Sequence, residues 1–333
     1  MIKFKKSINF SLWCDFIERD FLEDEFQDLL ENQTIQGATS NPAIFEQSIS
    51  NSGAYIQQIE MLQANSLKKI YEELAITDIK RAAQIMHPLY EQDNDDGFIS
   101  IEVDPLLCDD STATIAEGVR LFEEIAYDNV MIKVPATPAG YIAMKELTSK
   151  GINVNATLIF SVEQAILCTK ALNEGIKLSN DTAKAVVSIF VSRFDRLLDD
   201  KLVNLDIKPS QTGIMNAIKC YHEIQKFENI NIRTLFASTG VKGDALDASY
   251  YIDALIYPHS INTAPLATIN SYINKNEFIK SEIIEENECD EYFKMLEENG
   301  INIQEVSKQL LDDGLESFKV SFTNMIKKLK IEN

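Results

Sequence analysis

Short runs of apolar and β-branched residues recur eight times along the chain, and longer amphipathic runs separate them. This alternation is typical of an α/β fold with a parallel sheet, and eight strands are the number that closes a (β/α)8 barrel. We therefore predict a single (β/α)8 TIM barrel with additional helices. The expected strands cover residues 9–17, 34–40, 97–104, 130–136, 152–160, 185–191, 233–239 and, more weakly, part of 251–269.

Additional helices are expected in two places. One is an extra helical segment at about residues 54–91, with a cap at Thr77 or Asp78, and the other is a set of C-terminal helices at about 277–331. Neither an internal repeat nor a Gly/Ser-rich linker interrupts the chain, so residues 1–333 are expected to form one domain. Near the C-terminus, apolar residues are spaced alternately four and three residues apart, which places them in a stripe along one face of a helix. This stripe predicts that the last helix packs on the barrel. The stripe consists of Leu311, Leu315, Phe318, Phe322, Met325 and Leu329.

The net charge of the chain is −21, from 31 basic and 52 acidic residues. Because non-specific binding to nucleic acid or anionic membranes uses basic surfaces, this charge argues against both kinds of partner. An anionic substrate would need a local basic cluster. Five cysteines are scattered without CxxC spacing, and no apolar run approaches about 18 residues. We expect reduced thiols, no zinc site and a soluble, cytoplasmic protein.

The fourth expected strand carries a single lysine, Lys133, in an otherwise apolar run. A strand of a parallel sheet is buried on both faces, and burial of a lysine disfavours its charged form. The neutral amine is the form that attacks a carbonyl to make an imine. Lys133 could instead reach solvent past the strand end or pair with a carboxylate, so this stretch alone leaves the alternatives open.

Polar residues fall at the ends of seven expected strands, where the catalytic groups of α/β barrels lie. They are Asp15, Asn41, Glu102 with Asp104, Lys133, Asn155 with Thr157, Ser188 and Ser238. Each alone has a structural explanation as a helix cap, a turn residue or a partner of the backbone. Their coincidence with a buried lysine favours imine chemistry, which needs an amine, acids and bases, and donors for substrate hydroxyls.

Basic residues follow the sixth and seventh expected strands. Arg193 and Arg196 follow the sixth, and Lys242 follows the seventh together with Ser238. The loops after the late strands of α/β barrels often bind phosphate, which suits arginine forks and backbone N–H groups. The cluster therefore predicts a phosphorylated substrate. The alternative is that the two arginines pair with nearby carboxylates, namely Asp195, Asp199 or Asp200.

These segments resemble the transaldolases. The similarity is carried, in that family's order, by LWCDFI, GATSNPAIF (37–45), SIEVDP (100–105), VMIKVPAT through Gly140, GINVNATLIFS (151–161), SIFVSR (188–193), FASTGVK (236–242) and NTAPLATI (262–269). The resemblance implies a (β/α)8 barrel and a class I aldol mechanism without metal or cofactor. It further implies transfer of a dihydroxyacetone unit from sedoheptulose 7-phosphate or fructose 6-phosphate to glyceraldehyde 3-phosphate or erythrose 4-phosphate, in the non-oxidative pentose phosphate pathway.

The resemblance also implies catalytic roles for individual residues. Lys133 corresponds to the imine-forming lysine, and Asp15 to the carboxylate that exchanges the proton of the substrate's C4 hydroxyl. Glu102 and Thr157 correspond to a pair that shuttles protons through a water.

Substrate-binding roles follow from the same resemblance. The dihydroxyacetone moiety would be held by Asn41, Asn155 and Ser188. Arg193 and Ser238 match phosphate ligands. Some members of the family carry a second arginine shortly after this serine, but here Gly240 occupies that place and Lys242 is the candidate for the missing charge. Because lysine is a point charge and arginine a fork, this substitution changes how a phosphate can be held.

Three other functions stay open at this point. A fructose 6-phosphate aldolase would release free dihydroxyacetone, although Phe190 stands where aldolase relatives carry a tyrosine, which favours transfer. A non-catalytic sugar-phosphate binder could use the same scaffold. A Mg²⁺-dependent phosphosugar or enolate enzyme would use a carboxylate cluster, here Glu102, Asp104, Asp109 and Asp110.

The sequence leaves both a monomer and a homodimer possible.

Overall fold

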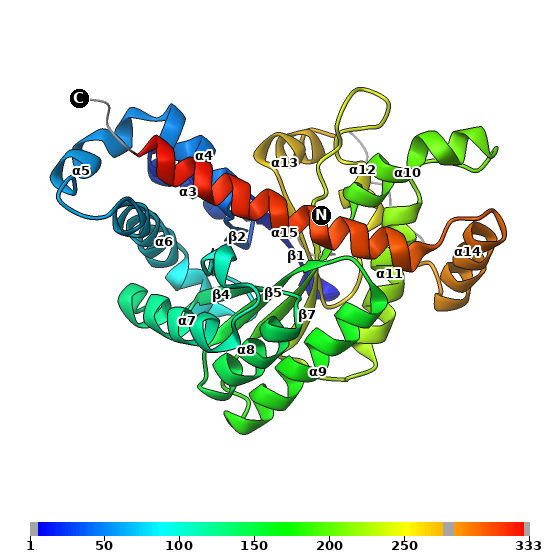
Figure 1. Cartoon of the computed structure of the whole chain (residues 1–333), viewed down its shortest axis with the longest axis horizontal. Coiled ribbons are helices and arrows are strands. Elements are labelled where there is room, and N and C mark those ends of the chain that lie inside the picture. The colour runs from blue at the N-terminus through cyan, green and yellow to red at the C-terminus, as the bar shows by residue number, and fades with distance from the viewer. Residues whose placement is uncertain (1–5, 276–282, 330–333) are drawn as a thin grey trace.

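The computed structural model describes residues 6–275 and 283–329, in which eight parallel strands, paired in chain order, close into a barrel (Figure 1). Helices surround the barrel, which confirms the TIM barrel fold predicted from the sequence. The strands are β1 (Phe10–Cys14), β2 (Gly37–Thr39), β3 (Phe98–Glu102), β4 (Val130–Pro135), β5 (Asn153–Ile159), β6 (Ala185–Phe190), β7 (Ile232–Ala237) and β8 (Ser260–Ala264).

Seven strands lie inside the stretches predicted for them, and β7 begins one residue earlier than predicted. The last predicted stretch, 251–269, contains more than a strand. Its first part belongs to α12 (Tyr250–Ala254), where Ser249 Oγ donates to Asp253 at 2.9 Å, and its end belongs to α13 (Leu266–Ile273). Between them β8 pairs with β1 from Phe10 to Cys14, and this pairing closes the barrel.

Helices fill the connections between consecutive strands. They are α2 (Arg19–Glu23), α3 (Glu25–Glu31), α4 (Pro42–Asn51), the 3-10 turn η1 (Gly53–Tyr55), α5 (Ile56–Met61), α6 (Leu67–Gln92), the 3-10 turn η2 (Pro105–Leu107), α7 (Ser111–Ile125), α8 (Pro138–Ser149), α9 (Val162–Leu178), α10 (Ser192–Asn204) and α11 (Thr212–Gln225).

The extra helical segment predicted at about 54–91 corresponds mainly to α5 and α6. The predicted cap at Thr77 or Asp78 is wrong, because both residues lie inside α6, which is capped by Ser66. Asp78 is buried and accepts hydrogen bonds from Arg19 Nε at 3.0 Å and Tyr55 Oη at 2.8 Å. A carboxylate with these partners is stable inside the helix, so it does not mark a helix start.

The barrel interior is divided into an apolar middle and two polar ends. Because side chains alternate along each strand, the register of the sheet places one set of side chains inside. Trp13 lies in the middle, and a Cβ on Gly37 would lie 2.6 Å from its ring, so β2 needs glycine there. The other apolar interior residues form one buried cluster with it, including Phe98, Met131, Val186, Leu235 and Ile261.

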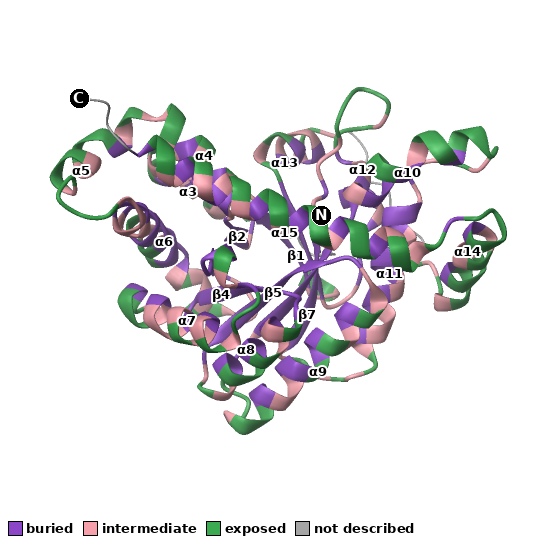
Figure 2. Ribbon diagram, viewed as in Figure 1, coloured by how far each residue is buried: buried purple, intermediate pink, exposed green. Residues whose placement is uncertain are grey.

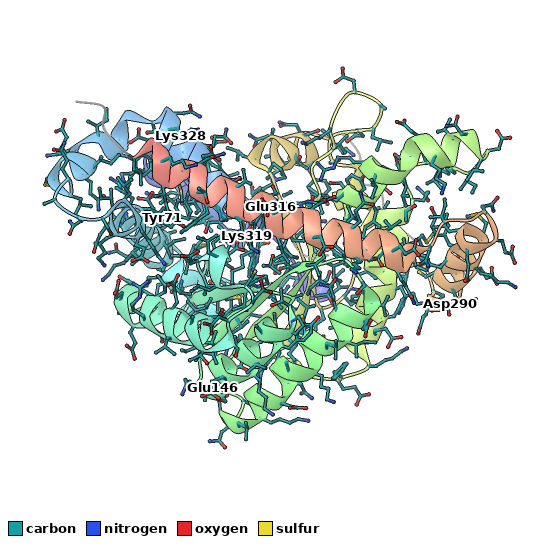
Figure 3. All side chains as sticks on the ribbon, viewed as in Figure 1. Tyr71, Glu146, Asp290, Glu316, Lys319 and Lys328 are labelled. Atoms are coloured by element: carbon teal, nitrogen blue, oxygen red, sulfur yellow. The ribbon has the colours of Figure 1, made fainter. Side chains whose placement is uncertain are left out.

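The last helix, α15 (Ile303–Lys328), runs across the barrel as a long red ribbon in Figure 1. Its inward side is buried (Figure 2), and Phe322 makes an edge contact with Tyr71 of α6, with ring centroids 5.4 Å apart. Lys319, near the middle of this helix in Figure 3, lies close to Cys108 in the loop after β3, and this thiol raises the pKa of Lys319. The predicted packing of the apolar stripe on the barrel is therefore confirmed.

The helix before it, α14 (Glu286–Glu298), exposes most of its acidic residues (Figure 2). Residues 277–282 and 330–331 of the predicted C-terminal helices lie outside the described residues. All five cysteines are free thiols. Within the described ranges no helix combines the length and apolar character needed to cross a membrane. That residues 1–333 form one domain stays a prediction.

Candidate active site

A row of polar side chains points into the barrel where β3, β4 and β5 end. In the register of the sheet Glu102 lies beside Lys133, and Lys133 lies beside Asn155. Neighbouring residues in register point to the same face of a sheet. All three side chains are buried, so a carboxyl group, an amine and an amide share one water-poor compartment at the carboxyl end of the barrel.

Lys133 lies inside this compartment and does not reach solvent, because its side chain is only 6% exposed. Its Nζ donates to the carbonyl oxygen of Ser40 at 3.0 Å and lies 3.9 Å from Glu102 Oε2. The alternative that Lys133 reaches solvent past the strand end is therefore wrong, and its pairing with a carboxylate is a long contact. A buried amine with these few partners suits attack on a carbonyl.

Glu102 has the properties of a proton donor at neutral pH. The pKa of Glu102 is raised to about 7, because the effect of burial and, to a smaller extent, of the Asp15 charge exceeds the opposing effect of the Lys133 cation. A carboxyl group with this pKa is present in both protonation states near neutrality, which suits general acid–base catalysis.

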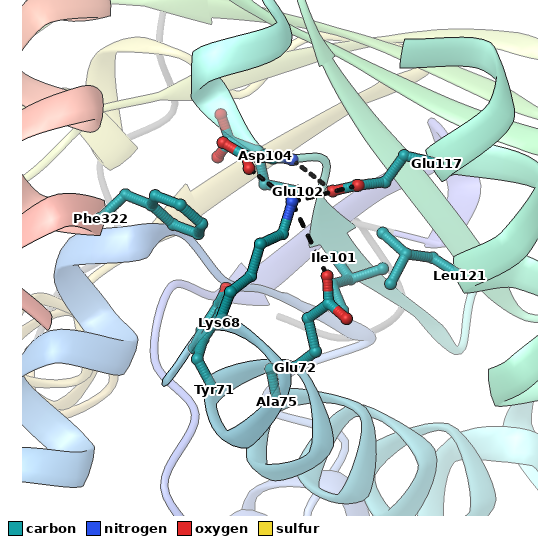
Figure 4. Close-up of a pocket in the computed structure, with 10 residues that line it drawn as sticks. All are labelled: Lys68, Tyr71, Glu72, Ala75, Ile101, Glu102, Asp104, Glu117, Leu121 and Phe322. Carbon is teal, nitrogen blue, oxygen red and sulfur yellow. Dashed lines mark hydrogen bonds and ion pairs between the residues drawn. The ribbon is translucent and has the colours of Figure 1, made fainter. Parts of the chain in front are cut away.

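A charged network lies beside Glu102 in the pocket between β3, α6 and α7 (Figure 4). Lys68 Nζ contacts Asp104 Oδ2 at 2.6 Å and Glu117 Oε2 at 3.5 Å, and Glu117 accepts a hydrogen bond from the backbone N–H of Asp104 at 2.9 Å. Glu72 completes the group at 3.9 Å from Lys68. Asp104 is therefore an ion-paired residue of the loop that follows Glu102.

Replacing Glu102 by glutamine is predicted to stabilise the fold at alkaline pH. The folded wild type binds this proton up to about pH 7, whereas the unfolded chain releases it near pH 4.5. Stability contributed by the wild-type residue therefore falls as pH rises between these values. We expect the free energy of unfolding of Glu102→Gln to exceed that of the wild type by on the order of 3 kcal/mol above pH 8, with no difference below pH 4.

Urea unfolding of both proteins across this pH range measures the effect. A difference that is independent of pH would contradict the assignment of a raised pKa to Glu102.

Asp15 follows β1 and lies at the same end of the barrel. Its Oδ1 accepts a hydrogen bond from Thr39 Oγ1 at 2.6 Å, and Thr39 in turn lies 2.8 Å from the hydroxyl of Thr263. Burial raises the pKa of Asp15, while the Lys133 cation and the Thr39 hydrogen bond lower it. Asp15, Glu102 and Lys133 thus form one coupled electrostatic group.

The predicted ligands of the dihydroxyacetone moiety lie around this group. Asn155 donates to Ser100 Oγ at 3.0 Å and accepts from Ser188 Oγ at 2.6 Å, so the two predicted residues hold each other. Asn41 caps α4 by accepting the N–H of Ile44 at 3.0 Å. It directly follows Ser40, whose carbonyl oxygen accepts the hydrogen bond from Lys133, so Asn41 lies on the same side of the barrel end as this lysine. Its amide NH₂ group remains a donor for a substrate hydroxyl.

Thr157 lies two residues beyond Asn155 on β5, and its side chain is completely buried. The hydroxyl of Thr157 and Glu102 Oε2 have no hydrogen-bond partner among the described residues. The next residue, Leu158, has a left-handed backbone with φ of 57°, and the register of β5 against β6 shifts there. Strain of this kind in a non-glycine residue is typical of functional sites, where it re-aims a neighbouring side chain.

The predicted phosphate ligands lie after β6 and β7. The guanidinium carbon of Arg193 lies 5.0 Å from the ring centroid of Phe190, which itself packs on Phe160 at 5.2 Å. Ser238 has a left-handed backbone with φ of 56°, and its carbonyl oxygen accepts the N–H of the residue before Arg193 at 3.0 Å. Lys242 is exposed in the loop after β7 and has no hydrogen bond or ion pair with any described residue.

Some residues that build the site were not predicted to take part in it. Thr39 holds Asp15 and is itself bonded to Thr263, Ser100 holds Asn155, and the carbonyl of Ser40 holds Lys133. The alternation of inward-facing residues along β2, β3 and β8 could have pointed to the three hydroxyl residues. Ser40 contacts Lys133 through its backbone carbonyl, which every residue type carries, so the sequence gives no sign of this contact.

The four carboxylates of the Mg²⁺ alternative do not converge on one point. Asp104 pairs with Lys68, Asp110 caps α7, and Asp109 accepts from the Cys108 thiol at 3.5 Å. Across residues 6–275 and 283–329 no three His, Cys, Asp or Glu side chains gather in a way that could hold a metal ion. The geometry therefore supports the amine-centred site over this alternative.

Comparison with known proteins agrees with this geometry. The family model described as transaldolase/fructose-6-phosphate aldolase matches residues 12–329. A transaldolase of Campylobacter jejuni subsp. jejuni serotype O:23/36 (strain 81-176) is 47% identical over 96% of this chain and 99% of its own length. A transaldolase of Helicobacter pylori (strain ATCC 700392 / 26695) is 42% identical over 95% of this chain and 98% of its own. The chain therefore belongs to the transaldolase/fructose-6-phosphate aldolase family.

Proposed function

We propose that the protein is a transaldolase that transfers a dihydroxyacetone unit from a ketose phosphate to an aldose phosphate, a reaction of the non-oxidative pentose phosphate pathway. The observation that carries this proposal is the buried amine of Lys133, in register with Glu102 and Asn155. The transaldolase relatives support sugar phosphates as substrates. The donor is sedoheptulose 7-phosphate or fructose 6-phosphate, and the acceptor is glyceraldehyde 3-phosphate or erythrose 4-phosphate.

The reaction begins at Lys133, whose neutral amine attacks the C2 ketone of the donor. Loss of water from the resulting carbinolamine gives an iminium ion, and Glu102 supplies the proton to the departing hydroxyl. The pKa of Glu102, about 7, supports this role. Glu102 Oε2 and Thr157 Oγ1 are buried polar atoms in need of a partner, which supports a water between them as the carrier of the proton.

Bond cleavage follows at Asp15. The iminium ion draws electrons from the C3–C4 bond while Asp15 accepts the proton of the C4 hydroxyl, and an aldose phosphate leaves. A three-carbon enamine remains attached to Lys133. It attacks the carbonyl carbon of a second aldose phosphate, Asp15 returns the proton to the new C4 oxygen, and hydrolysis frees the product. Burial of Asp15, which raises its pKa, makes the carboxylate a stronger base for the first step.

Binding of the two ends of the donor follows from the same arrangement. The amides of Asn41 and Asn155 and the hydroxyl of Ser188 are proposed to hold the dihydroxyacetone end beside Lys133, and Arg193 with Ser238 is proposed to hold the phosphate. Asn41 follows β2, Asn155 and Ser188 lie on β5 and β6, and Arg193 and Ser238 follow β6 and β7, which supports a substrate that lies across the barrel end.

Transfer is distinguished from release by the fate of the enamine. The apolar ring of Phe190 supplies no hydroxyl that could hold a water against the enamine, so we expect the aldose phosphate to compete well with water. With fructose 6-phosphate and erythrose 4-phosphate, NMR should show glyceraldehyde 3-phosphate and sedoheptulose 7-phosphate without free dihydroxyacetone. Free dihydroxyacetone as the main product would favour the fructose 6-phosphate aldolase alternative.

The cytoplasmic location and a monomeric or homodimeric state stay predictions from the sequence.

A further inference from the structure

We propose that Arg196 is a second cationic ligand of the substrate's phosphate group, acting with Arg193 and Ser238. The inference rests on the proposed function, because it adds a residue to the same sugar-phosphate site. The loop after β7 carries Gly240 and has no arginine. A sugar phosphate carries about two negative charges at neutral pH, which Arg193 alone would not balance.

Arg193 and Arg196 differ from every other arginine of the chain. All six arginines lie within the described residues, and four of them have a carboxylate within 4 Å: Arg19, Arg81, Arg120 and Arg233. No described carboxylate lies that close to Arg193 or Arg196. In a chain of net charge −21, two neighbouring arginines without a carboxylate partner indicate that an anion binds between them.

Two carboxylates of α10 are occupied by other groups. Asp195 accepts the backbone N–H of Gly213 at 2.9 Å and the hydroxyl of Tyr251 at 2.8 Å. Asp199 accepts the backbone N–H of Ser210 at 2.7 Å and its hydroxyl at 2.8 Å. These contacts join α10 to α11 and α12.

A chain of contacts connects Arg196 to the expected phosphate ligand Ser238. Arg196 Nε donates to the carbonyl oxygen of Ser192 at 3.3 Å, and Ser192 Oγ lies 3.2 Å from Ser238 Oγ. Ser192 is also the first residue of α10, a helix of 13 residues that has no side-chain cap at its N-terminus. The positive end of this helix adds to the attraction for an anion.

Arg193 itself is held by packing contacts. Its guanidinium lies over the rings of Phe190 and Phe160, at 5.0 and 5.9 Å, and a Cβ on Gly314 of α15 would lie 3.2 Å from its Nη1. Burial and the neighbouring Arg196 cation lower the pKa of Arg193 to about 10, and Asp313 opposes this shift. An anion bound to both guanidinium groups would relieve their repulsion.

Calorimetric titration of fructose 6-phosphate tests the proposal without any turnover, using Lys133→Ala protein, which binds the sugar but forms no imine. Adding Arg196→Ala should weaken the Kd by about 10- to 100-fold, because charge-assisted hydrogen bonds to the phosphate are lost. Arg196→Lys should recover part of the affinity. The matched control Arg81→Ala, an exposed arginine paired with Glu23, should change the Kd by less than about twofold.

A second measurement excludes a general disturbance of the site. Trapping of dihydroxyacetone, which has no phosphate, by borohydride on Lys133 should be unchanged in Arg196→Ala. An unchanged Kd in Arg196→Ala, together with a weakened one in Arg193→Ala or in Lys242→Ala, would overturn the role of Arg196 and leave the proposed function standing. A Kd that none of these variants changes would remove the phosphate site itself, and the proposal with it.

Discussion

Replacement of Lys133 by alanine is expected to lower kcat/KM for transfer from fructose 6-phosphate to erythrose 4-phosphate by at least about 10⁴-fold. The amine forms the covalent bond to the donor, and no other described lysine shares its buried place beside Glu102 and Asp15. The protein should remain folded. Once the Lys133 cation is gone, nothing opposes the effect of burial on the pKa of Glu102, so this carboxyl group stays protonated and uncharged near neutral pH.

A coupled assay of glyceraldehyde 3-phosphate formation measures the effect, and circular dichroism checks the fold. Lys145→Ala is the matched control, because Lys145 is an exposed lysine of α8 that pairs with Glu174 at 2.7 Å. Its activity should stay within about twofold of the wild type. Activity of Lys133→Ala within tenfold of the wild type would contradict an imine at this residue.

Replacement of Arg233 by alanine is expected to lower the free energy of unfolding by about 3–5 kcal/mol. This arginine is 3% exposed and fills the end of the barrel opposite the candidate active site. Its guanidinium donates to the carbonyl oxygens of Asp95, Asn9 and Ser260 at 2.7–3.0 Å and to Ser11 Oγ at 2.8 Å. The variant leaves these acceptors unpaired, leaves a cavity, and removes the cation that lies 3.6 Å from Asp96.

Urea unfolding at pH 7 compares the two proteins. Arg81→Ala is the control, since Arg81 makes an exposed ion pair with Glu23 and should cost no more than about 1 kcal/mol. The candidate active site lies at the other end of the barrel, so kcat/KM of folded Arg233→Ala should change by less than about tenfold. A decrease of less than about 1 kcal/mol in the free energy of unfolding of Arg233→Ala would show that Arg233 does not stabilise the end of the barrel opposite the candidate active site.

Much of the fold could be predicted from local sequence. Strands such as β4 and β6 are rich in valine and isoleucine, because a parallel strand is buried on both faces. The same burial makes Lys133 stand out, since a lysine in such a run has no other simple explanation. Residues at the ends of neighbouring strands, such as Glu102 and Asn155, could be grouped with it because the ends of parallel strands meet.

The rest depends on contacts between distant parts of the chain. Whether Arg193 and Arg196 pair with Asp195 could not be decided locally, because its partners Gly213 and Tyr251 come from other helices. The left-handed backbone at Leu158 arises where the register of β5 against β6 shifts, and leucine carries no sign of it. Residue type likewise hides that Asp78 faces inward from a helix.

Borohydride trapping tests the central claim, that Lys133 forms an imine with a ketose phosphate, most directly. The protein is incubated with fructose 6-phosphate, reduced, digested and examined by mass spectrometry. We predict a reduced three-carbon adduct on Lys133, which is absent from Lys133→Ala and diminished when erythrose 4-phosphate is added before the reductant, because the acceptor removes the enamine. No adduct on Lys133 in folded protein, or an adduct on another lysine that persists in Lys133→Ala, would contradict the account.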